Sequence, residues 1–172
     1  MIGKATATAA AIALCSTSAL QAAQKSCVSS TEMHGMVAYF LPVVLDNVAK
    51  NCSAFTPASA YLRAGLPSLQ VQLRENREAA WPMAKSAFFK LVGQKDVRTM
   101  AALSDEALRP LVDDMLGSKF AIPVDAAKCG EVNDIAEALA PLNAPQTVHL
   151  IATILSTAAR KDNKLSSCPR GI

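Results

Sequence analysis

The chain has only two histidines, which are the first residues to consider for acid–base or metal chemistry. Around His149, polar side chains recur every three or four residues, and this polar stripe consists of Gln146, His149, Thr153, Ser156, Thr157 and Arg160. Such a stripe is either the solvated edge of a packed helix or the lining of a cleft. In a cleft, His149 is the best candidate for a general base and Thr153 for a binding residue. His34 lies away from the apolar stripe of its own segment, which indicates a surface position.

Known catalytic and metal-binding spacings are missing from the sequence. Neither histidine belongs to an H-E-x-x-H pattern, so we predict no metal site and no cofactor. The pairs Asp105-Glu106 and Asp113-Asp114 are adjacent in sequence, and neighbours on a helix point about 100° apart. Neither pair can therefore flank one bond as a glycosidase dyad does. No G-x-S-x-G, Walker or dinucleotide-binding motif occurs, which favours a non-catalytic protein.

Two aromatic residues suggest an apolar binding surface. Phe88 and Phe89 are neighbours and cannot both point into one core, so we place Phe89 at a boundary. Tyr39 lies on the flank of the first predicted helix. Together, Tyr39 and Phe89 would form an apolar surface patch or line a ligand pocket, although core packing is the commoner role for such residues.

The chain has five cysteines, and an odd number needs an explanation. Cys15 falls in a predicted leader, which leaves Cys27, Cys52, Cys129 and Cys168 to form two disulfides in an oxidising compartment. A predicted helix of about 20 residues separates Cys27 from Cys52 and holds its ends about 30 Å apart, whereas a disulfide needs Cα atoms within about 7 Å. We therefore expect each of these two cysteines to pair with the C-terminal half, in either of the two possible arrangements.

Residues 1–23 are typical of a secretory signal peptide. One charge, Lys4, precedes an Ala-rich apolar stretch at 5–14, and small residues allow cleavage after Ala22 or Ala19. The residues before Cys15 resemble a lipobox, but bulky Leu14 stands where a small residue is expected, so we do not expect a lipoprotein. The leader predicts a periplasmic or secreted protein.

Helix signals dominate residues 24–172. Ser29 and Glu32 have the spacing of a capping box, Thr56-Pro57 predicts a second helix start, and Asp125 opens a later helix. Alternation of apolar and polar residues, the signal of a strand, is scarce. We predict an all-α fold, a single bundle of about six or seven helices with two disulfides.

Charge and hydropathy limit the classes of partner that the protein is expected to bind. A net charge of +3 is too small to indicate nucleic-acid binding, and no apolar run approaches the roughly 20 residues of a membrane-spanning helix. Charge is segregated, with seven basic and three acidic residues in 60–100 but three basic and eight acidic in 101–140. Either the two regions meet inside the bundle, or they form a bipolar surface that steers a charged partner.

The sequence thus predicts an exported, non-catalytic helical protein of the bacterial periplasm or cell envelope. It would act by binding a protein partner or an apolar small molecule, and an envelope stress chaperone or an inhibitor-type protein would have this composition. Two alternatives stay open: a hydrolase-type enzyme with His149 as general base, and a structural assembly subunit.

Overall fold

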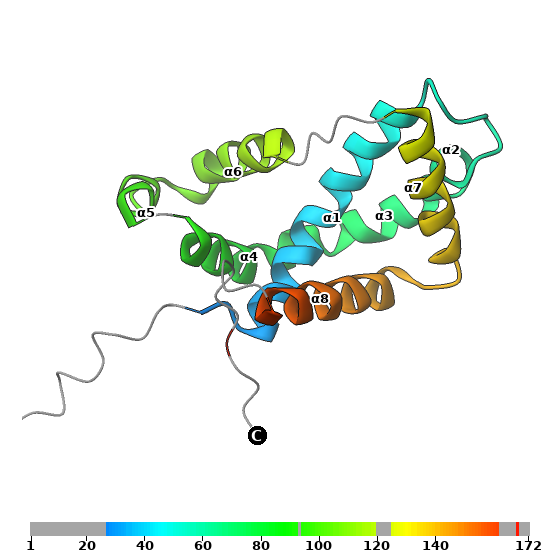
Figure 1. Cartoon of the computed structure of the whole chain (residues 1–172). Helices are drawn as coiled ribbons and strands as arrows, with labels where there is room; N and C mark the ends of the chain where they lie inside the picture. The colour runs from blue at the N-terminus through cyan, green and yellow to red at the C-terminus, as the bar shows by residue number, and fades with distance from the viewer. Residues whose placement is uncertain (1–26, 93, 120–124, 162–167, 169–172) are drawn as a thin grey trace, which may run out of the picture.

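The structure is a computed structural model that describes residues 27–92, 94–119, 125–161 and 168 (Figure 1). This part contains eight helices and no strand, which confirms the all-α fold. One more helix than predicted arises because Gly65 separates a four-residue helix from the next one. The helices are α1 (Ser30–Cys52), α2 (Tyr61–Ala64), α3 (Leu66–Glu75), α4 (Arg77–Leu91), α5 (Gln94–Met100), α6 (Asp105–Lys119), α7 (Ala126–Ala138) and α8 (Ala144–Lys161).

The predicted leader and its cleavage sites lie outside the described residues. None of the helices in the described part combines the length and apolar character needed to cross a bilayer.

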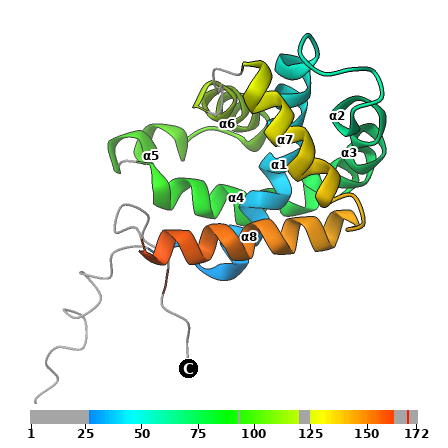
Figure 2. The same ribbon diagram turned by 45° about the vertical axis from the view of Figure 1, so that its right-hand side comes forward.

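Helix α1 is the centre of the bundle, and α3, α4, α6 and α8 all pack against it (Figures 1 and 2). It begins with the predicted capping box: the Glu32 backbone N–H donates to Ser29 Oγ (3.2 Å), and the Ser29 N–H donates to Glu32 Oε2 (2.8 Å). Because neighbours surround most of α1, its buried residues are not confined to one stripe. Met33 and Val37 enter one core cluster, while Tyr39 and Phe40 enter another.

The two core clusters divide the bundle. The first joins α1 to α2, α3, α7 and α8, and its large buried side chains include Val28, Met33, Val37, Leu62, Leu66, Leu73 and Val148. The second joins α1 to α4, α5 and α6, and it contains Tyr39, Phe40, Trp81, Ala84, Phe88, Met100, Leu108 and Val112. Both clusters share α1, so displacement of this helix would disturb the whole core.

Two disulfides tie the ends of α1 to the C-terminal half of the chain. Cys27 pairs with Cys168, with Cα atoms 4.9 Å apart, and Cys52 pairs with Cys129, with Cα atoms 5.4 Å apart. This confirms that neither bridge joins Cys27 to Cys52. The paired cysteines are 141 and 77 residues apart, for which loop-closure entropy gives a stabilisation of about 4–5 kcal/mol per bridge. Beside the first bridge, the Cys168 N–H donates to the Val28 carbonyl (3.0 Å).

Of the predicted helix starts, the one at Thr56-Pro57 is wrong and the one at Asp125 is confirmed. The hydroxyl of Thr56 donates back to the Cys52 carbonyl (2.9 Å) instead of capping a new helix, and α2 begins only at Tyr61. Pro82 lies inside α4, and the break before this helix falls at Asn76. Asp125 caps α7 as predicted, since its carboxylate accepts from the Lys128 N–H (2.9 Å).

Helices α4 and α6 are joined by oppositely charged side chains. Arg77 pairs with Asp113 (2.5 Å), Lys85 pairs with Asp105 (2.6 Å), and Glu78 pairs with Arg109. The order of the partners along the two helices is antiparallel. Part of the charge segregation in the sequence is therefore explained by complementary helices that meet inside the bundle.

Helices α1 and α4 approach each other closely at Gly35. A Cβ atom at this position would lie 2.3 Å from Met83 Cβ, a distance that real Cβ atoms do not reach. Because Met83 Cβ is fixed to the α4 backbone, rotation of the Met83 side chain cannot relieve the clash. Glycine at position 35 therefore sets how near the two helices lie.

We predict that Gly35→Ala destabilises the fold by about 1–3 kcal/mol, the usual effect of overpacking, although alanine is the better helix former. The matched control is Gly130→Ala in α7, where an added Cβ meets no atom within 4 Å. This control should stabilise by about 0.5–1 kcal/mol. Urea unfolding followed by circular dichroism measures both, and equal effects of the two substitutions would contradict the close approach.

A second tie between α1 and α4 is the buried carboxylate of Glu32, which is 8% exposed. Ser86 Oγ donates to it (2.6 Å) and Lys90 Nζ donates to it (2.7 Å), in addition to the Ser29 N–H. Burial alone would raise the pKa of Glu32. The hydrogen bonds from Lys90, Ser86 and Ser29 outweigh burial and lower the pKa from 4.5 to about 2.

This shift predicts acid sensitivity. The unfolded chain binds the Glu32 proton more readily, so the stabilisation is complete above pH 4.5 and is lost as the pH falls from 4.5 through about 2. Glu32→Gln should therefore lower the unfolding free energy at pH 7 by about 3 kcal/mol, and the difference from wild type should shrink towards pH 2. The control is Glu137→Gln on the exposed surface of α7. Unfolding curves at a series of pH values test this, and a difference independent of pH would refute it.

Candidate functional site

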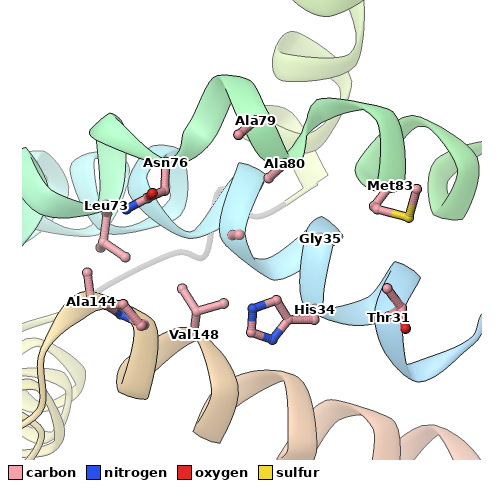
Figure 3. Close-up of a pocket in the computed structure, with 12 residues that line it drawn as sticks. Thr31, His34, Gly35, Leu73, Asn76, Ala79, Ala80, Met83, Ala144 and Val148 are labelled. Carbon is pink, nitrogen blue, oxygen red and sulfur yellow. The ribbon is translucent and has the colours of Figure 1, made fainter.

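A groove of about 360 Å³ lies over α1, between α4 on one side and α8 on the other (Figure 3). Both of these helices pack on α1. The groove is lined by four residues of α1, by Leu73 and Asn76, and by three residues each of α4 and α8. The helical residues are Thr31, His34, Gly35 and Ala38, then Ala79, Ala80 and Met83, then Ala144, Pro145 and Val148.

Small side chains leave this space open. Gly35 and Ala38 form part of the α1 wall, while Ala79 and Ala80 line the α4 side and Ala144 the α8 side. Asn76, where the chain breaks between α3 and α4, also lines the groove. Replacing any one of these alanines by a larger residue would fill space that a ligand would otherwise occupy.

The groove carries polar groups but no formal charge from Asp, Glu, Lys or Arg. Its polar side chains are Thr31 and Asn76, which lie at opposite ends, and His34 between them (Figure 3). Asn76 Nδ2 donates to the Gln72 carbonyl (3.3 Å), which holds its amide in place. An uncharged, apolar groove with a few polar groups is the ordinary form of a small-molecule site.

The structure brings His149 and His34 together. Their ring centroids are 6.2 Å apart and both residues are exposed, on α8 and α1 respectively. His34 lines the groove, and its ring lies beside Val148 on the α8 side (Figure 3). The sequence indicated a surface position for His34 but not this pairing, because it does not specify which helix packs against the N-terminal turns of α1.

The hypothesis of a general base required a Ser, Asp or Glu within hydrogen-bond reach of His149. Among the described residues, His149 makes no hydrogen bond to a carboxylate or hydroxyl. Its ring lies near the ring of His34. Thr153 is exposed one turn further along α8, and its carbonyl accepts from the Thr157 hydroxyl (2.8 Å). The Thr157 hydroxyl in turn accepts a hydrogen bond from the Arg160 guanidinium (3.0 Å). Some residues of the polar stripe on α8 therefore form hydrogen bonds with one another.

Tyr39 and Phe89 belong to the second core cluster and do not line the groove. Tyr39 is 0% exposed, because α4 and α6 cover the flank of α1 that was expected to face solvent, so it cannot contribute to a surface patch. Its ring lies 4.9 Å from Trp81, and the Arg77 guanidinium lies 4.2 Å from its centroid. Phe89 is half-buried beside Phe88, at a centroid distance of 6.0 Å.

Burial makes Tyr39 unsuitable for proton transfer. Desolvation raises the pKa of its hydroxyl to about 12, although the charge of Arg77 opposes the increase. Its Oη has no hydrogen-bond partner among the described residues. Arg77 and Arg109 lie over the Tyr39 and Trp81 rings respectively, at 4.2 Å and 5.1 Å, so this region is a charged layer that attaches α6 to the core.

Cysteine chemistry is not available in the described part, because Cys27, Cys52, Cys129 and Cys168 are all in disulfides. The described residues contain no group of three or more His, Cys, Asp or Glu side chains that could hold a metal ion. The groove with the adjacent pair of histidines is therefore the arrangement to which a function can be assigned. Comparison of the chain with protein-family models, with curated proteins and with solved structures finds no match.

Proposed function

We propose that this protein is an exported, non-catalytic binding protein that holds an apolar small molecule in the groove between α1, α4 and α8. The observation that carries the proposal is the groove itself, with a volume of about 360 Å³, no charged carboxylate, ammonium or guanidinium in its wall, and small apolar side chains on three helices. A volume near the lower end of the usual range of ligand sites, about 300–1,000 Å³, favours a compact molecule or one segment of a longer chain.

The energetics favour an apolar ligand. Burying apolar surface contributes about 25 cal/mol per Å², whereas an ion entering this groove would lose hydration with no countercharge in the wall. Thr31, His34 and Asn76 would orient a ligand that carries a single polar group. Export is supported by the predicted leader and by the two disulfides, which persist in oxidising compartments.

Blocking the groove tests the proposal. Ala79 is exposed and lines the groove, so Ala79→Phe should fill much of the space without disturbing the core. The matched control is Ala107→Phe at an exposed position of α6. We expect the apolar fluorophore N-phenyl-1-naphthylamine to bind wild type and the control saturably with one site. Ala79→Phe should weaken this binding about tenfold or more, a loss of about 1.4 kcal/mol.

Equal binding of the fluorophore by all three proteins would locate its site elsewhere and remove the groove from the proposal. Solvent extraction of purified wild-type protein, followed by mass spectrometry, is an independent measurement. A co-purified apolar molecule that is absent from Ala79→Phe would support the groove as its site.

The alternative of a structural assembly subunit rests on exposed apolar side chains of α8. Leu150 is 37% exposed and Ile154 is 56% exposed, one turn apart on the helix. An assembly subunit predicts self-association through such a surface. Light scattering distinguishes the two functions, since a monomer at high concentration contradicts the assembly role and leaves the binding role intact.

A further inference from the structure

The two histidines of the chain come from segments far apart in sequence and meet at one place. His34 on α1 and His149 on α8 have ring centroids 6.2 Å apart, with an interplanar angle of 51°. Both residues are exposed, so water and dissolved ions reach them. Imidazole is the commonest metal ligand among protein side chains.

We propose that His34 and His149 bind a single divalent transition-metal ion, with Cu²⁺ held most tightly, at the edge of the groove. A metal–nitrogen bond of about 2.0–2.1 Å puts the ion about 3.2 Å from the centroid of each ring, so one ion can join centroids up to about 6.4 Å apart. The observed separation lies within this limit. Opposite corners of a square arrangement need centroids about 6.4 Å apart, close to the observed distance. A tetrahedral arrangement or adjacent corners of a square need about 5 Å, which rotation of the two exposed side chains can supply.

The ligand set selects the metal. Two neutral imidazoles suit Cu²⁺, Ni²⁺ and Zn²⁺, and for nitrogen ligands the affinity rises to a maximum at Cu²⁺. All four described cysteines are oxidised and so cannot contribute thiolates. Because no third His, Cys, Asp or Glu joins the pair among the described residues, water completes the coordination shell. The ion therefore keeps coordination positions open to solvent, and the affinity of the two histidines for it should be modest.

Binding at this pair would link α1 to α8. Helix α8 has no disulfide of its own in the described part, and Cys168 follows it only after residues outside the description. An ion that binds the folded arrangement but not the separated side chains stabilises the fold by mass action. The proposal does not rest on a ligand in the groove, since the geometry of the two imidazoles alone carries it.

The test is a Cu²⁺ titration of the whole protein prepared without a histidine tag, in a buffer that does not bind copper. Calorimetry should give one equivalent bound to wild type, and either His34→Ala or His149→Ala should weaken binding at least about tenfold. Thr153→Ala, an exposed position one turn from His149, is the matched control and should bind as wild type. Zn²⁺ in place of Cu²⁺ should bind more weakly.

Electron paramagnetic resonance of the wild-type protein with one equivalent of Cu²⁺ gives a readout that does not depend on any variant folding. The spectrum should show two equatorial imidazole nitrogens bound to Cu²⁺. In the double variant His34→Ala/His149→Ala, the features of both nitrogens should be lost. Binding that persists unchanged in both single variants would overturn the proposal. Loss of binding in only one single variant would also overturn the proposal, and so would a spectrum with one coordinated nitrogen. Either result would place the ion on a single histidine or at the chain terminus.

Discussion

Helix α1 is buried around most of its circumference, and both of its ends are held by disulfides to the C-terminal half of the chain. Every other feature depends on this constraint. Cys52–Cys129 holds α7 at the C-terminal end of α1, and Cys27–Cys168 holds Cys168 beside the N-terminal end of α1. A helix fixed at both ends cannot slide, so side chains on its surface keep their register against α4, α6 and α8.

The groove follows from how α4 and α8 pack on this fixed helix. Gly35 lets α4 approach α1 until Met83 would touch any added Cβ, and Glu32 holds the same two helices by hydrogen bonds to Ser86 and Lys90. Helix α8 packs beside them through Ala144, Val148 and Ala152. Small side chains on the facing surfaces cannot fill the remaining space, and the result is an apolar depression supported by rigid elements.

Local signals predicted much of the fold, and tertiary contacts decided the rest. Helix caps and helix length are local properties, so the start of α1, the Asp125 cap and the exclusion of a Cys27–Cys52 bridge could be predicted. The full burial of Tyr39 and the approach of His34 to His149 depend on which helices cover α1. Thr56 was misassigned because its hydroxyl bonds to a carbonyl four residues earlier, an alternative that competes with capping.

The two faces of α4 differ in charge. Arg77, Glu78 and Lys85 pair with α6, while Ala79, Ala80 and Met83 face the groove on the other side of the helix. Because the charged side chains of α4 lie at the contact with α6, the wall of the groove has no fixed charge. An apolar ligand can therefore enter without displacing a strongly hydrated group. His34 is the one titratable side chain among the residues that line it. A metal ion on the histidine pair would place positive charge beside this groove and so change which ligands it accepts.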